Sequence, residues 1–200
     1  MIKHRFIPEL NARLTLLDIR KLKPYAEEIL LSLPEERRQK AMRYRKEDDR
    51  LRSIGSSLLI MQTIGNRKLQ YGEYGKPFVL GKHFNVSHSG NYVVLAQAPN
   101  SVGVDIEEIV GENISELAQV SLTRREQLWA EKSALRFFLL WTRKESLLKC
   151  IGTGFFTEPN QVEVLTESVF FMGKFYRLSG IIIDNHVASI ASIYPDIAAV

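Results

Sequence analysis

The chain has 200 residues, of which 45% are hydrophobic and 25% are charged, and its formal net charge is +4. This composition supports one core or two small ones and excludes disordered and fibrous proteins. The apolar runs are shorter than the roughly 20 residues of a membrane-spanning helix, and the N-terminus lacks a signal peptide's continuous apolar region. A single cysteine, Cys150, cannot form an internal disulfide, so we expect a cytoplasmic protein that does not bind membranes.

The first 65 residues predict strands followed by two helices. Residues 2–20 are expected to hold a strand, which Pro8 limits to an edge or short element, and then a loop or second strand. Helices are expected over residues 34–44 and 46–64. Apolar side chains at helical spacing define the buried stripe of the second helix (Leu51, Ile54, Leu58, Met61), which leaves Arg50, Arg52 and Ser53 off that stripe.

Glycines and prolines interrupt short apolar stretches from residue 70 onward, a pattern typical of strands and tight turns. Strands are expected over residues 84–86, 92–98 and 102–106, with a turn over 87–91. Thr123 and Glu126 match a capping box that begins a helix through residue 132. A long helix is expected over 133–151, and three alternating segments after residue 161 predict a closing antiparallel sheet.

Helices followed by strands therefore occur twice, although no close internal repeat is visible in the sequence. We predict an α+β fold of two similar halves, each a small antiparallel sheet with helices packed on it. Each sheet needs a partner surface to cover its apolar face, so the halves are expected to pack together. Their predicted ranges are residues 1–101 and 102–200.

The long helix carries an acid and a base beside its apolar stripe. Glu145 and Lys149 lie four residues apart, on the flank of a stripe formed by larger side chains (Phe137, Leu140, Trp141, Leu148, Ile151). By itself such a pair indicates an ordinary surface salt bridge that contributes little stability. The pair indicates a functional site only if charged residues elsewhere in the chain lie beside it.

Two carboxylates, those of Asp105 and Glu107, are expected on the same face of one strand. Like charges at this spacing are unfavourable unless a positive charge lies between them. Mg²⁺ takes one or two carboxylates together with phosphate oxygens, and Glu145 is a possible third ligand. The alternative is an acidic strand that faces solvent.

Three further residues are candidate ligand contacts. Lys76 lies between a glycine and a proline that confine it to extended geometry, so its ammonium is expected to point in a defined direction. Ser87 and His88 lie at a strand end, where side chains often reach a ligand. His88 alternatively binds only backbone, and metal ligation by it is disfavoured because no cysteine or histidine cluster accompanies it. The phosphate-binding motif of P-loop NTPases is absent, and so is the G-x-S-x-G elbow that would support Ser87 as a hydrolase nucleophile.

Eight basic residues are concentrated in one short segment (Arg37, Arg38, Lys40, Arg43, Arg45, Lys46, Arg50, Arg52). Such a run indicates a solvated helix face, a site for an anionic small molecule, an acidic protein partner or nucleic acid. Tyr44 is the only aromatic residue among them, which is few for a protein that binds single strands.

Four motifs in order, GKP (75–77), FNVSHS (84–89), GVDIE (103–107) and WTRKESLLKCIGTG (141–154), closely resemble those of the surfactin-type 4'-phosphopantetheinyl transferases. The resemblance extends from about residue 34 to 155. It implies an enzyme with two pseudo-two-fold halves and an active site between them. Such enzymes use Mg²⁺ to transfer the 4'-phosphopantetheine arm of coenzyme A to a serine of an apo acyl or peptidyl carrier protein, releasing adenosine 3',5'-bisphosphate.

Matched residue by residue, the resemblance implies that Asp105, Glu107 and Glu145 are the Mg²⁺ ligands. Glu145 is also implied to accept the serine proton, and Lys149 to contact the reacting phosphates and stabilise the leaving group. Glu126 matches an acidic position near the site, a role that competes with its capping box.

The resemblance also assigns coenzyme A contacts to Lys76, Ser87 and His88. Arg52 is expected to meet the 3'-phosphate, because a guanidinium binds phosphate in fork geometry, and Ser53 is the alternative at this position. Other arginines of residues 37–45 are assigned to coenzyme A or to the acidic carrier.

The implied partners are coenzyme A and a carrier protein of fatty-acid, polyketide or nonribosomal-peptide synthesis, with neither nucleic acid nor membrane. The length of the chain favours the two-domain monomeric form over the small trimeric one. One alternative is a non-catalytic basic module that binds nucleic acid through residues 37–52. Another is a degenerate transferase that binds coenzyme A without turnover, for which the motif residues provide no positive support.

Overall fold

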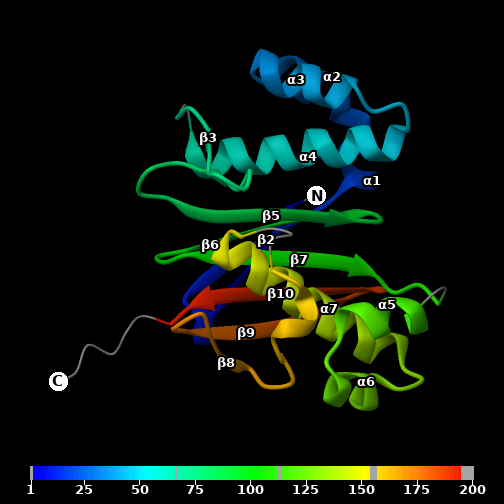
Figure 1. The fold of residues 1–200 in the computed structure, drawn as a ribbon. Helices are drawn as coiled ribbons and strands as arrows, with labels where there is room; N and C mark the ends of the chain where they lie inside the picture. Colours follow the sequence, from blue (N-terminus) through cyan, green and yellow to red (C-terminus); the bar gives the residue numbers. More distant parts are fainter. Residues whose placement is uncertain (1, 66, 112–113, 154–156, 195–200) are drawn as a thin grey trace.

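The computed structural model describes residues 2–65, 67–111, 114–153 and 157–194, and Figure 1 shows helices packed on two antiparallel sheets. The first sheet has the strand order β1-β2-β6-β5, and the second has the order β7-β10-β9-β8. The predicted α+β fold with antiparallel sheets is therefore confirmed. Within the described ranges, the helices fall short of the length and apolarity that crossing a bilayer requires.

The first sheet and its helices come from the first hundred residues. Its strands are β1 (Ile2–Ile7), β2 (Ala12–Asp18), β5 (His83–Ser89) and β6 (Tyr92–Ala98). Its helices are α1 (Ile19–Leu22), α2 (Ala26–Ser32), α3 (Glu35–Met42) and α4 (Glu47–Ile64). The expected edge strand is confirmed, because β1 lies at the end of the sheet and Pro8 begins the 3-10 turn Pro8–Leu10.

The buried face of α4 is wider than the predicted stripe. Leu51 and Ile54 are buried as expected, whereas Leu58 is only partly buried. Ser53, expected off the stripe, is only 7% exposed, so this prediction was wrong. Small residues let the helix approach the sheet closely, since a Cβ on Gly55 would lie 3.1 Å from a methyl of Leu17 on β2.

The predicted turn over residues 87–91 is also wrong. Ser87, His88 and Ser89 continue β5 and pair with β6, so the turn consists of Gly90 and Asn91 alone. Gly90 has a φ of 49°, and a Cβ there would lie 2.4 Å from Nε2 of His186. A tight glycine turn therefore allows the strand to extend and carries Ser87 and His88 on a rigid element.

The second sheet and its helices come from the remainder of the described chain. The strands are β7 (Val102–Glu108), β8 (Ser168–Phe171), β9 (Lys174–Ile183) and β10 (His186–Ile193). The helices are α5 (Ile114–Ser121), α6 (Arg124–Ala130) and α7 (Ala134–Ile151). The predicted closing sheet and long helix are confirmed, and the short strands β3 (Gln70–Tyr71) and β4 (Pro77–Phe78) form a separate ribbon.

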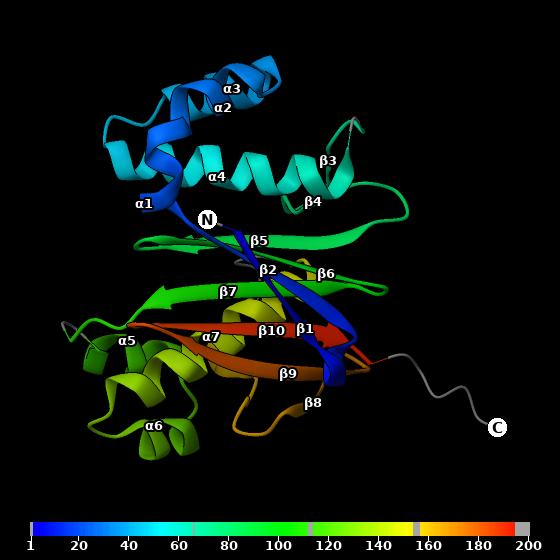
Figure 2. The same cartoon turned by 180° about the vertical axis from the view of Figure 1, so that it is seen from behind.

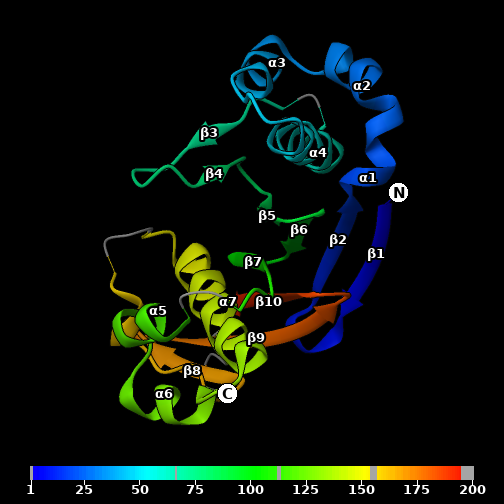
Figure 3. The same ribbon diagram turned by 90° about the vertical axis from the view of Figure 1, so that its right-hand side faces the viewer.

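Three apolar clusters hold these layers together. One lies beneath α4, one surrounds α7, and a third joins the two sheets through residues such as Val94 of β6 and Val104 of β7. Figure 3 shows α4 above β5 and β6, with α7 beside β7 and β10. The side-chain Oδ1 of Asn85 on β5 also accepts a hydrogen bond of 2.9 Å from the Val104 N–H. The sheets therefore form one packed body, while a domain boundary at residue 101 stays a prediction.

Gly103 determines how closely α7 approaches β7. A Cβ at this position would lie 2.0 Å from the carbonyl oxygen of Ser146 and 2.4 Å from the backbone nitrogen of Cys150. Both atoms belong to the helix backbone, which cannot move aside as a flexible side chain does. The contact therefore requires glycine.

Gly103→Ala is accordingly expected to lower the free energy of unfolding by about 2–4 kcal/mol, because α7 must move away from the sheet. Urea denaturation measures this change. Gly111→Ala is the matched control, since a Cβ on Gly111 has no neighbour within 4 Å and the variant should unfold like the parent. Equal stability of the two variants would show that the close packing of α7 on β7 is not needed.

Candidate functional site

A cleft of about 510 Å³ lies between the basic helix α3 and helix α4 on one side and β5, β7 and α7 on the other. Six of the residues expected at the site line it together (Ser87, His88, Asp105, Glu107, Glu145, Lys149). They come from three different elements that only the tertiary fold brings to one place. Arg52 and Lys76, which were also expected there, are not among its lining residues.

The alternation of β7 directs Asp105 and Glu107 toward α7, on the same face as Gly103. Asp105 is only 2% exposed, whereas Glu107 remains partly exposed to the cleft. Glu145 and Lys149 lie one turn apart on α7 and are both partly buried. The solvent-facing acidic strand considered above is therefore not what the structure has.

Lys149 pairs with Asp105 across the cleft floor. Its Nζ lies 2.5 Å from Oδ1 of Asp105 and 3.2 Å from Oγ of Ser87. Ser87 Oγ in turn donates to Asp105 Oδ1 at 2.9 Å. The ordinary ion pair between Glu145 and Lys149 does not form within the described residues, because the ammonium is directed to the strand instead.

The three carboxylates of the cleft hold their protons unusually well. Burial raises the pKa of Asp105, even though Lys149 opposes this shift. Burial, followed by the negative charge of Asp105, raises the pKa of Glu107 to about 7 and also raises the pKa of Glu145. Asp105 therefore disfavours the ionised forms of Glu107 and Glu145, and added positive charge would relieve this repulsion.

These residues fit a hard divalent cation in donor type, although the expected cluster is not assembled. Among the residues that the structure describes, no three Asp, Glu, His or Cys side chains form a ready-made metal site. Oδ2 of Asp105 is nevertheless buried without a hydrogen-bond partner, and Glu107 and Glu145 supply further carboxylate oxygens nearby. Oxygen donors of this kind suit Mg²⁺, so an ion could bind if Lys149 released Asp105.

The raised pKa of Glu107 predicts a pH effect on stability. The folded state binds the proton more tightly than the unfolded chain, whose ordinary pKa is 4.5. The resulting stabilisation is complete below pH 4.5 and is lost as the pH rises through about 7.

Between about pH 5 and 8, the melting temperature of the parent should therefore fall relative to that of Glu107→Gln, which has no proton to lose. Thermal melts of both proteins across this range measure the difference. Glu163→Gln, at an exposed ion pair outside the cleft, should follow the parent. Parallel curves for the parent and Glu107→Gln would contradict the shift.

Lys76 lies beside the cleft, between its two lining neighbours Gly75 and Pro77. Its Nζ donates to the carbonyl oxygens of Cys150 at 3.0 Å and Val102 at 3.2 Å. Burial lowers the pKa of this lysine. The side chain is directed as expected, but it caps the C-terminal end of α7, where Gly152 follows the helix in the left-handed conformation. Gly154, near the end of the last motif, lies outside the described residues.

The basic segment contributes to the cleft through residues other than Arg52. Nη1 of Arg52 donates to the Gly90 carbonyl oxygen at 2.6 Å, and Nη2 pairs with Asp49 at 2.5 Å. Ser53, the alternative to Arg52, does line the cleft. Arg37 and Lys40 of α3 face it from the opposite side. The segment therefore places positive charge across from the carboxylates.

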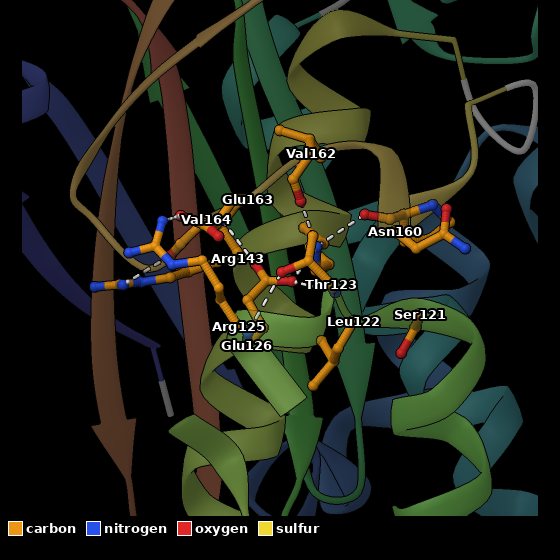
Figure 4. Close-up of polar contacts among 12 residues, drawn as sticks. Ser121, Leu122, Thr123, Arg125, Glu126, Arg143, Asn160, Val162, Glu163 and Val164 are labelled. Carbon is orange, nitrogen blue, oxygen red and sulfur yellow. Dashed lines mark hydrogen bonds and ion pairs between the residues drawn. The ribbon is translucent and has the colours of Figure 1, made fainter. Parts of the chain in front are cut away.

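Glu126 is part of the core and does not line the cleft. Its carboxylate accepts from the Thr123 N–H at 2.8 Å and the Val164 N–H at 2.7 Å (Figure 4). It also pairs with Lys144 at 2.7 Å. Both charged side chains are 0% exposed. The predicted capping box is confirmed, and the buried ion pair joins α6, α7 and the loop before β8.

Several cleft residues were not identified from the sequence. Ser56 and Ser57 of α4 line it beside the expected Ser53, as do Tyr71 and Trp141. Oγ of Ser56 is buried without a hydrogen-bond partner. The spacing of these serines places them on one helix face. The pattern of apolar residues does not reveal them, because serine is not apolar.

Comparison with known proteins finds the same family that the sequence motifs resemble. Residues 101–181 match a family described as the 4'-phosphopantetheinyl transferase superfamily, and residues 21–100 match the N-terminal region of 4'-phosphopantetheinyl transferases. The 4'-phosphopantetheinyl transferase gsp of Aneurinibacillus migulanus is 36% identical over 143 residues, which cover 64% of this chain and 60% of that protein.

Two further relatives are similar over less of the chain. The 4'-phosphopantetheinyl transferase Sfp of Bacillus subtilis (strain 168) is 28% identical, covering 60% of each chain. The L-aminoadipate-semialdehyde dehydrogenase-phosphopantetheinyl transferase of Xenopus laevis is 31% identical, covering 56% of this chain and 44% of its own. The chain thus spans about three fifths or less of the length of these relatives.

Proposed function

Since the chain belongs to the 4'-phosphopantetheinyl transferase superfamily, we propose that it transfers the 4'-phosphopantetheine group of coenzyme A to a serine hydroxyl of an apo acyl or peptidyl carrier protein. The observation that carries this proposal is the cleft itself. It combines three carboxylates and Lys149 on one wall with Arg37 and Lys40 on the other. An anionic substrate and a metal ion together would neutralise both walls.

Asp105, Glu107 and Glu145 would hold a Mg²⁺ ion, which supplies positive charge to the pyrophosphate of coenzyme A when it is bound. The buried, unpartnered Oδ2 of Asp105 supports this assignment. Lys149 exchanges its contact with Asp105 for one with the reacting phosphates, because its half-exposed side chain can move into the cleft. This lysine then stabilises the charge of the leaving phosphate.

Glu145 accepts the proton of the attacking serine hydroxyl. Its raised pKa, caused by burial and by Asp105, makes it a stronger base than an ordinary carboxylate. Its carboxylate makes no hydrogen bond or ion pair with other described residues, so it is available to substrate. The phosphorus–oxygen bond to adenosine 3',5'-bisphosphate breaks as the serine oxygen bonds to phosphorus, and that bisphosphate is the second product.

Ser87 and His88 bind the phosphates of coenzyme A from β5. Lys76 contributes by holding the end of α7 and reaches a phosphate only if it leaves its carbonyl partners. Ser53, Arg37 and Lys40 are better placed than Arg52 for the 3'-phosphate, since they line the cleft. Arg52 instead supports the Gly90 turn that follows His88.

We also propose that the halves formed by residues 1–101 and 102–200 bind substrate between them and that the enzyme acts as a cytoplasmic monomer. Incubating the protein with coenzyme A, Mg²⁺ and a panel of apo carriers tests the activity. At least one carrier should gain the mass of one phosphopantetheine group, and chelation with EDTA should prevent the gain. No gain on any carrier, with coenzyme A binding intact, would identify a degenerate transferase instead.

A further inference from the structure

A second cavity, of about 520 Å³, lies between α6, α7, β9 and the end of β1. It shares no lining residue with the cleft. The β1–β2 hairpin extends toward β9 in Figure 2, and Oγ of Ser179 on β9 donates to Glu9 at 2.8 Å. The cavity is therefore built by contacts between the two sheets and is separate from the proposed transferase site.

A buried guanidinium, that of Arg143, lines this cavity with part of its hydrogen-bonding capacity unused. The residue is 9% exposed, and Nη1 donates to the carbonyl oxygens of Val164 at 3.1 Å and Leu165 at 3.3 Å. Figure 4 shows Arg143 beside Val164. Nε is buried without a partner, and Arg143 forms no ion pair with any described residue.

This arrangement suits the binding of an anion. A buried charge is unfavourable unless an opposite charge or a full set of hydrogen bonds compensates it. Nη1 is already bound to carbonyl oxygens, and Nη2 makes no hydrogen bond within the described ranges. Nε and Nη2 form one edge of the guanidinium, which matches the two oxygens of a carboxylate.

The remaining walls combine apolar surface with a small excess of positive charge. Trp129, Leu135 and Leu139 provide the apolar surface, and the Arg136 guanidinium lies 5.2 Å from the Trp129 ring centre. Three arginines and two glutamates line the cavity (Arg5, Arg136, Arg143, Glu9, Glu167). The balance favours a ligand with a single negative charge over a phosphate ester with two.

We propose that this cavity binds a small apolar monocarboxylate, such as a medium-chain fatty acid, through the free edge of Arg143. The hydrocarbon part packs against Trp129, Leu135 and Leu139. The cavity volume lies within the range of about 300–1,000 Å³ that is usual for small-molecule sites. Its occupation does not depend on the transferase activity, because no residue of this cavity belongs to the cleft.

Titration calorimetry with sodium octanoate tests the proposal, with 1-octanol and sodium acetate as probes that lack the charge or the chain. Octanoate should bind in a saturable manner at least about tenfold more tightly than either probe, since both parts of the ligand contribute. Fluorescence of Trp129, recorded in Trp141→Phe, should change with the same saturation. Equal binding of octanol, or no octanoate binding at millimolar concentration, would overturn the proposal.

Matched variants locate the site. Arg143→Lys should weaken octanoate binding at least about tenfold, because lysine lacks the paired N–H donors of the guanidinium edge. Arg125→Lys, at an exposed ion pair outside the cavity, should bind octanoate like the parent.

Glu167→Gln should tighten octanoate binding, since Glu167 is the negative charge that acts on Arg143. If Arg143→Lys fails to fold, Leu135→Trp, which fills the cavity and keeps Arg143, should abolish binding. If folded Arg143→Lys or folded Leu135→Trp bound octanoate with the parental affinity, octanoate would bind outside this cavity.

Discussion

Asp105→Asn is expected to reduce phosphopantetheine transfer to an apo carrier by at least about 100-fold. The substitution removes the buried carboxylate whose unpartnered Oδ2 is the proposed metal ligand and whose Oδ1 contacts Lys149 and Ser87. Mass spectrometry of the carrier measures the rate. In the proposed mechanism the metal ion, Glu145 and the reacting phosphates all lie beside this carboxylate, so a large loss of activity is expected when its charge is removed.

The same variant should keep its melting temperature close to that of the parent. Asparagine retains an oxygen that accepts from Ser87, and it avoids the unfavourable burial that raises the pKa of Asp105. Lys149 is left without its partner, but its side chain is 32% exposed and can reach water. Glu163→Gln, outside the cleft, is the control and should transfer normally. Transfer by Asp105→Asn at the parental rate would refute the metal assignment.

Lys144→Met is expected to lower the free energy of unfolding by about 3–5 kcal/mol, because it leaves the buried Glu126 carboxylate without its counter-ion. The lysine also donates to the carbonyl oxygens of Pro159 and Val162, and these hydrogen bonds attach the loop before β8 to α7. Chemical denaturation measures the loss. Combining Lys144→Met with Glu126→Gln should restore part of the stability, since the double variant no longer buries an uncompensated charge.

This pair of variants also decides the role of Glu126. A structural role predicts that the double variant, assayed below its melting temperature, transfers phosphopantetheine at close to the parental rate per folded molecule. A role in the reaction predicts a large loss even when circular dichroism shows a folded chain. The position of Glu126, inside the core and absent from the cleft lining, favours the first result.

Much of this fold could be predicted because local patterns and tertiary packing agree. The long helix α7 follows its apolar spacing and begins after the N-cap Ser133, whose Oγ accepts a hydrogen bond from the Arg136 N–H. The alternation of β7 correctly placed Asp105 and Glu107 together. Local rules failed where a neighbouring element changed the outcome, as in β5, where pairing with β6 extends the strand through Ser89 into the predicted turn.

The amino-acid sequence by itself determined the family motifs, the strand that carries the paired acids and the helix that carries Glu145 and Lys149, because each depends on spacing along one segment. Only the tertiary structure decided which charges meet. Lys149 contacts Asp105 rather than Glu145, Lys144 is buried with Glu126, and Arg143 lines a separate cavity. Three consecutive charged residues of α7, Arg143, Lys144 and Glu145, project about 100° apart around the helix axis. Each therefore meets a different part of the fold, which a linear motif does not specify.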